Sequence, residues 1–87
     1  MPVLLITYDL NRPGQDYPGL LEEIRSTSWA RLSESSYAVD TSESASAVYD
    51  RVRPHIDDGD NIFIITLSAP WRSWGPEDVN NWLSSRL

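Results

Sequence analysis

A single carboxylate, Asp9, directly follows a run rich in β-branched and aromatic residues at 3–8 and belongs to the segment Tyr8-Asp-Leu-Asn11. A carboxylate at the exposed end of a strand can hold Mg²⁺ through one or two oxygens, with waters in the remaining positions. One such residue makes a poor site, but a two-fold dimer would bring in a second Asp9. In the alternative interpretation, Asp9 only organises the next turn through a side-chain hydrogen bond.

Two other polar segments are weaker candidates for chemistry. His55 is the only histidine, and neither a serine nor a carboxylate lies at a recognisable catalytic spacing from it, so we interpret it as a surface or helix-end residue. The segment Asp57-Asp-Gly-Asp60 lacks the alternating ligands and terminal glutamate of an EF-hand loop. It is typical of a solvated helix end.

The segment Trp71-Arg-Ser-Trp74 places an arginine between two tryptophans. Tryptophan with a nearby arginine is frequent at interfaces, where it stacks on bases or on a partner's side chains. Alternatively, one of the two indoles seats the last helix against the sheet. Trp71 and Trp74 are therefore candidate interface residues, with both interpretations open.

The elements that position these residues follow from hydrophobic periodicity. Strands are predicted at 3–8, 28–33, 36–40 and 61–67, the first and last as central strands and the middle two as half-exposed ones. Apolar residues at helical spacing predict one helix capped by Asp16 and a second capped by Thr41 or Ser42. Pro54 interrupts the second pattern, so a kink or an end is expected near Val52. A third helix begins at Pro76.

The order β-α-β-β-α-β predicts an α+β domain of the ferredoxin-like type, an antiparallel sheet with both helices on one face. We assign residues 1–87 to one domain, with a core at 2–67 and a C-terminal loop and helix at 68–87. The other face of such a sheet must be covered. Either the C-terminal helix folds across it or a second copy of the chain does.

Composition narrows the classes of function. Among 87 residues, thirteen acids oppose seven bases, all arginine, for a net charge of −6. An acidic surface repels nucleic acid at long range and disfavours it as a partner. The chain has no cysteine, which excludes disulfides and thiolate metal sites. Without a membrane-spanning run or a targeting segment, a cytoplasmic protein with no membrane partner is expected.

The stretch from residue 8 to residue 17 resembles the small SinR-like proteins, with weaker similarity through about residue 67. These proteins resemble, more distantly, the small CRISPR-associated adaptation subunit and the virulence-associated D endoribonucleases. The residues that carry the resemblance are Tyr8, Asp9, Leu10, Asn11, Pro13, Gly14, Gln15, Asp16 and Tyr17.

The resemblance implies a ferredoxin-like homodimer in which Asp9 stands where the relatives place a metal-binding aspartate. It makes Asp9 the candidate catalytic and metal-binding residue, Mg²⁺ the candidate cofactor, and Tyr8 and Asn11 flanking loop residues. Metal-dependent nuclease activity and DNA bridging are assigned among the relatives. This chain departs from them because it has no lysine and no basic stripe.

Three functions follow as hypotheses. The first is a dimeric interaction module of this fold group without catalysis. The alternative is a Mg²⁺-dependent endonuclease, for RNA or DNA, that uses paired Asp9 carboxylates across a homodimer. The third is a small-molecule binder with a pocket under the C-terminal helix.

Overall fold

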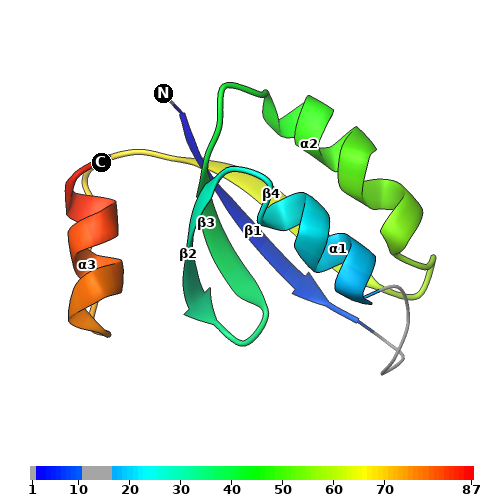
Figure 1. Cartoon of the computed structure of the whole chain (residues 1–87), viewed down its shortest axis with the longest axis horizontal. Coiled ribbons are helices and arrows are strands. Elements are labelled where there is room, and N and C mark those ends of the chain that lie inside the picture. The colour runs from blue at the N-terminus through cyan, green and yellow to red at the C-terminus, as the bar shows by residue number, and fades with distance from the viewer. Residues whose placement is uncertain (1, 11–16) are drawn as a thin grey trace.

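The computed structural model describes residues 2–10 and 17–87 as a mixed α+β structure (Figure 1). In this part of the chain, four antiparallel strands form one sheet, and three α-helices pack against it. The predicted turn at 11–14 and the predicted cap Asp16 lie outside the described residues. The elements are β1 Val3–Asp9, α1 Tyr17–Ile24, β2 Ser28–Ser33, β3 Ser36–Asp40, α2 Ala45–Val52, a 3₁₀ turn Arg53–His55, β4 Asn61–Leu67 and α3 Glu77–Ser84.

The strand order is β2-β3-β1-β4, and all neighbours are antiparallel. β1 is central, as predicted, with Leu5 paired to Ala38 on one side and to Ile65 on the other. Two predictions were wrong: β4 is an edge strand, and the central β3 is buried at residues 37–39 rather than half-exposed. β3 is buried on both sides because helices cover both faces of the sheet there.

The main core lies between the sheet and the two helices α1 and α2, which lie on the same face (Figure 1). Every second residue of β1 and β3 points into this layer, as the two-residue period of a strand requires. The apolar stripes of α1 and α2 pack against these strand residues and complete the main core. The buried members are Leu4, Ile6, Tyr8, Leu20, Ile24, Tyr37, Val39, Val48, Val52 and Ile56.

The start of α2 differs from the prediction. Ser44 is the cap, since its hydroxyl accepts a hydrogen bond from the Ala47 amide at 3.1 Å. The Thr41 hydroxyl instead accepts from the amide of Glu43, which stabilises a turn before the helix. The helix ends at Val52, as predicted, and Pro54 lies in the 3₁₀ turn that follows.

Arg51 joins α1 to α2 through a group of charge-assisted hydrogen bonds. Its guanidinium donates to Glu43 Oε1 at 2.7 Å, to Glu23 Oε1 at 3.0 Å and to the Glu23 carbonyl at 2.7 Å. The hydrogen bond from Arg51 holds the pKa of Glu43 below its ordinary value of 4.5. A carboxylate with a lowered folded-state pKa stabilises the fold above its unfolded pKa, and this contribution is lost as the pH falls through the folded value.

We predict that Arg51→Met lowers the free energy of unfolding at pH 7 by about 1 kcal/mol, since the partners are partly screened by water. The difference between wild type and variant should shrink as the pH falls below 4.5 and through the lower folded-state pKa of Glu43, because Glu43 is then progressively protonated in the folded wild type. Urea denaturation at pH 7 and pH 3 measures this difference in the free energy of unfolding. The matched control is Arg53→Met, whose partner Asp58 is fully exposed, so that a smaller change than for Arg51→Met is expected. A pH-independent difference would contradict this account.

α3 lies on the opposite side of the sheet from α1 and α2 (Figure 1). Its Leu83 packs against Val3 and Ala38, the residues of β1 and β3 that point away from the main core. The Trp82 indole N–H donates to Ser28 Oγ at 3.1 Å, and Arg86 Nε donates to Asp40 Oδ2 at 2.9 Å. The C-terminal helix therefore covers its own sheet, although only in part. None of the helices described is long and apolar enough to cross a membrane.

Candidate functional site

Beyond Val3 and Leu67, which pack in the cluster with Leu83, the half of the sheet face formed by β1 and β4 is not covered by α3. We call this surface the open face. Its apolar centre is uncovered to an unusual extent, because Phe63 is 60% exposed and Ile65 49% exposed, beside the half-buried Leu5. Alternation along the two strands gives the open face its members, which are Leu5, Thr7, Asp9, Asn61, Phe63 and Ile65.

The sequence of β4 is that of a strand buried on both sides. Ile62 and Ile64 pack against the main core, while Phe63 and Ile65 project from the other face into solvent. An uninterrupted apolar run is typical of strands covered on both faces, whereas a strand with one wet face usually alternates with polar residues. One face of β4 is therefore exposed, although its composition is typical of a strand that is covered on both faces.

Asp9 lies at the end of β1, on the open face and paired in register with Asn61. Its side chain is exposed, and within residues 2–10 and 17–87 it makes no hydrogen bond or ion pair. The proposed hydrogen bond of Asp9 to the following turn concerns residues that the structure does not describe. The carboxylate is positioned by the sheet, since β1 is paired on both sides.

Tyr8 points the other way, into the main core, where it is 5% exposed. Its hydroxyl lies 2.9 Å from that of Tyr17, and the two rings meet edge to face. Burial and the Tyr17 hydroxyl raise the pKa of Tyr8 above its usual range. In the structure Tyr8 therefore fixes the end of β1 to the start of α1 and does not lie beside Asp9 on the open face. Asn11 lies outside the described residues.

Metal binding by one subunit would rest on Asp9 alone on this face. In the described ranges, no group of three or more histidine, cysteine, aspartate or glutamate side chains is arranged to hold a metal ion. The acidic segment after α2 forms a turn, in which the Asp57 amide donates to Asp60 Oδ2 at 2.8 Å. His55 Nε2 lies 3.8 Å from Glu23 Oε2, at the end of the 3₁₀ turn. The acidic turn borders the open face, because Asp57, Asp58 and Asp60 line a depression that also includes Asn61 and Phe63.

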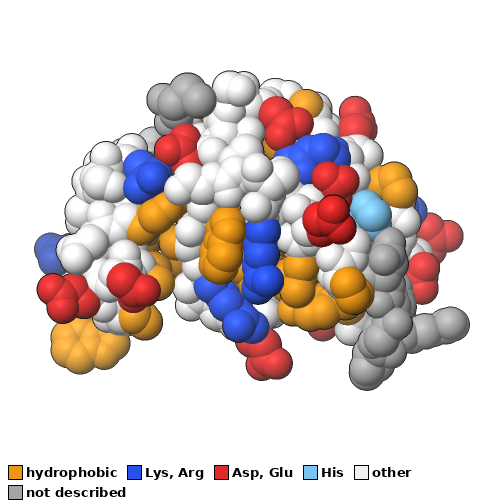
Figure 2. Space-filling view, in the orientation of Figure 1, with side chains coloured by type: hydrophobic (Ala, Val, Ile, Leu, Met, Phe, Trp, Pro, Cys, Tyr) orange, Lys and Arg blue, Asp and Glu red, His pale blue; other side chains and the backbone are white. Residues whose placement is uncertain are grey.

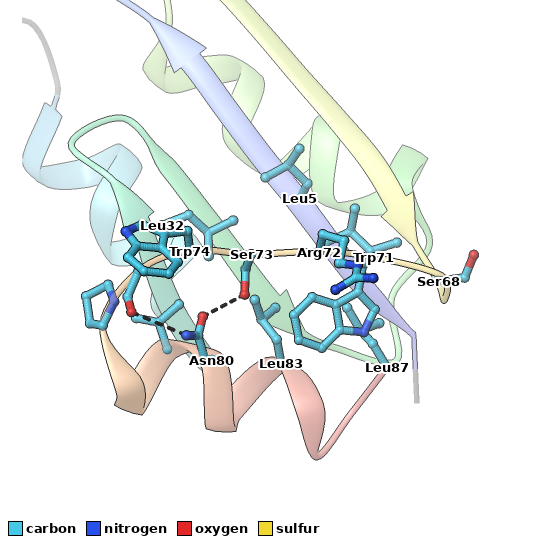
Figure 3. A pocket seen from close by; sticks show the side chains of 14 residues that line it. Leu5, Leu32, Ser68, Trp71, Arg72, Ser73, Trp74, Asn80, Leu83 and Leu87 are labelled. Atoms are coloured by element: carbon cyan, nitrogen blue, oxygen red, sulfur yellow. Dashed lines mark hydrogen bonds between the residues drawn. The ribbon is translucent and has the colours of Figure 1, made fainter.

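A groove beside the open face brings together the C-terminal residues. It has a volume of about 360 Å³ and runs between the loop 68–76, α3 and the sheet (Figure 3). The two tryptophans differ in role. Trp71 packs against the cluster of Val3, Ala38 and Leu83, while Trp74 is fully exposed at the rim of the groove. The groove is lined by Leu5, Leu32, Leu67, Ser68, Trp71, Arg72, Ser73, Trp74, Gly75, Pro76, Val79, Asn80, Leu83 and Leu87.

A second aromatic and basic cluster lies over β2, on the side of α1. Arg25 stacks on Trp29 at 4.9 Å and donates to the Tyr37 hydroxyl at 2.6 Å, while Arg31 donates to the carbonyls of Ser33 and Glu34. Figure 2 shows basic side chains flanking a hydrophobic one over this strand. Because both guanidinium groups are bonded within the chain, the cluster acts in packing.

Scanned against models of known protein families, curated proteins and solved structures, the chain matches none of them. The interpretation of the site therefore depends on its own geometry.

Sequence reasoning missed Phe63 and Ile65. The signal for both residues was present in the unbroken apolar run at 62–65, which indicated burial on both faces without showing which face the fold leaves bare. The segment Trp71-Arg-Ser-Trp74 had already pointed to Arg72, but the sequence does not show that the other described arginines are hydrogen-bonded within the chain and that Arg72 is not.

Proposed function

We propose that this chain is a homodimeric interaction module of the ferredoxin-like fold, assembled through the open face. The observation that carries the proposal is the exposure of Phe63 and Ile65 on a strand whose other side is packed. A second copy offers the same apolar surface, and a two-fold axis makes that surface self-complementary. Burying this apolar surface on both copies stabilises the dimer by about 25 cal/mol for each Å² of apolar area removed from water.

The ferredoxin-like assignment is supported by the strand order and by the placement of α1 and α2 on one face. We further propose membership of the SinR-like group, on the residues from Tyr8 to Tyr17 given above. The open face carries one charged residue, Asp9, in a chain of net charge −6. An acidic chain repels nucleic acid at long range, whereas an apolar patch offers a second copy area to bury, which favours a second copy over nucleic acid as the partner. We place the protein in the cytoplasm.

Sedimentation velocity over a range of protein concentrations tests the proposal. We expect a species of twice the 9.9-kDa subunit mass at micromolar concentration, dissociating on dilution. Dissociation should depend weakly on salt, because the contact is apolar. A monomer at every concentration up to about 100 µM contradicts the proposal. The dissociation constant would then be about 1 mM or weaker, which corresponds to a binding free energy of only about 4 kcal/mol.

The second candidate function is Mg²⁺-dependent endonucleolytic cleavage by paired Asp9 residues. It is favoured by one observation, an exposed carboxylate without a partner in the described chain, on the face that we propose for dimerisation. In that arrangement, two carboxylates would hold the ion, which supplies an activated water and neutralises the scissile phosphate.

We predict that Asp9→Ala abolishes any Mg²⁺- or Mn²⁺-dependent cleavage of RNA or DNA, a loss of at least about 100-fold, because the ion would lose its ligand. The matched control is Asp50→Ala, which removes an exposed carboxylate from α2. The readout is the cleavage rate of labelled single- and double-stranded substrates, with and without EDTA. Equal rates in wild type and Asp9→Ala would assign the cleavage to a contaminant and refute the nuclease function.

A further inference from the structure

The groove under α3 holds the one described arginine that has no partner. Of the six arginines in the described part of the chain, five donate hydrogen bonds: Arg25, Arg31, Arg51, Arg53 and Arg86. Arg72 makes no hydrogen bond, ion pair or ring contact there, and it lines the groove. Its guanidinium is exposed to solvent at the groove, where an anion could reach it.

The rest of the groove is apolar and already formed. Apart from Arg72, its lining has no charged side chain and is mainly leucine, valine, proline and tryptophan. Its loop is fixed to α3, because Ser73 Oγ donates to Asn80 Oδ1 at 2.7 Å and Asn80 Nδ2 donates to the Gly75 carbonyl at 3.3 Å. Figure 3 shows Trp71 and Arg72 toward one end of the groove and Trp74 with Leu32 toward the other.

We propose that this groove binds a small amphiphilic carboxylate, a molecule with one apolar chain or ring and one carboxylate. The guanidinium fork of Arg72 matches a carboxylate in a bidentate arrangement. A volume of about 360 Å³ falls at the lower end of the range for small-molecule sites. A single cation, with no second charged side chain in the lining, favours a monoanion over a phosphate dianion. The site goes beyond the dimer and does not depend on it.

The apolar part of the ligand lies along Leu83 and Val79 of α3 and is closed over by Trp74. Trp74 is fully exposed at the rim of the groove, so its indole can contact a ligand that lies there. A ligand under this indole would bury its face. Trp74 therefore contributes to the affinity of the apolar part, and Arg72 contributes to the affinity of the carboxylate.

Isothermal titration calorimetry with octanoate, and with 1-octanol as the uncharged analogue, tests the site. We expect saturable binding of octanoate, at least about tenfold tighter than that of octanol, which is 1.4 kcal/mol. Arg72→Gln should weaken octanoate about tenfold and leave octanol unchanged, whereas Trp74→Ala should weaken both. The matched control Arg53→Gln, on the far side of the fold, should change neither.

Both variants replace exposed side chains, so folding should be preserved, and circular dichroism verifies it. Absence of saturation by octanoate, or equal affinities of wild type and Arg72→Gln, overturns the proposal. Sedimentation of the same samples keeps the two proposals separate, because loss of octanoate binding with an intact dimer refutes the groove alone. A monomer that still binds octanoate refutes the dimer alone.

Discussion

Replacing Tyr37 by alanine is expected to lower the free energy of unfolding by about 3–5 kcal/mol, the usual cost of removing a buried aromatic ring. Tyr37 is the largest fully buried side chain and lies in the middle of the central strand β3. A domain of this length has about 4–13 kcal/mol of stability in total. The variant should therefore lose a large share of that stability, as measured by urea denaturation followed by circular dichroism.

Two controls divide the effect of Tyr37 into its parts. Tyr37→Phe keeps the ring against Trp29 and removes only the hydrogen bond from Arg25, so a loss of about 1 kcal/mol is expected. Tyr49→Ala removes the same side chain from an exposed position on α2 and should cost less than about 1 kcal/mol. A cost for Tyr37→Ala as small as that for Tyr49→Ala would show that the core is not packed as described.

Placing a charge on the open face is expected to abolish dimerisation without unfolding the subunit. In Ile65→Glu, a carboxylate replaces an apolar side chain that is half exposed in the free subunit and buried in the proposed dimer. The substitution enters the interface twice because of the two-fold symmetry. We expect the dissociation constant to rise at least about 100-fold, or about 2.7 kcal/mol. Size-exclusion chromatography with light scattering measures it.

The matched control for this prediction is Thr66→Glu. It adds the same charge one residue further along β4, at an exposed position on the opposite face of the strand. A face-to-face dimer should tolerate this change. If Thr66→Glu disrupts the dimer as strongly as Ile65→Glu, the contact is made through the strand edge or the helix side, and the assignment to the open face is wrong.

The local elements could be predicted from sequence, because their signals are local. Alternation and helical spacing placed all four strands and three helices close to their observed bounds, and Pro54 marked the end of α2. The cap of α2 was misplaced by two or three residues because Thr41, Ser42 and Ser44 are equivalent capping residues until the turn after β3 is known. Choosing between them needs the backbone.

The position of each strand in the sheet, and with it the site, could not be predicted in the same way. The apolar run of β4 predicts cover on both faces, and whether that cover comes from the same chain depends on where α3 lies. α3 packs over β2 and β3 because Trp82 and Arg86 bind Ser28 and Asp40, contacts across more than forty residues of sequence. No short-range pattern encodes that choice, and it is what exposes Phe63 and Ile65.

The most direct measurement of the proposed interface is a distance between two spin labels in electron paramagnetic resonance. The chain has no cysteine, so Asn61→Cys and Ser68→Cys each provide a single labelling site, at the two ends of β4. We predict a defined inter-subunit distance from each site, shorter from residue 61, beside Asp9, and lost when Ile65→Glu is added. Dipolar coupling absent from both labelled proteins at dimer-forming concentrations would contradict a contact between copies at the open face.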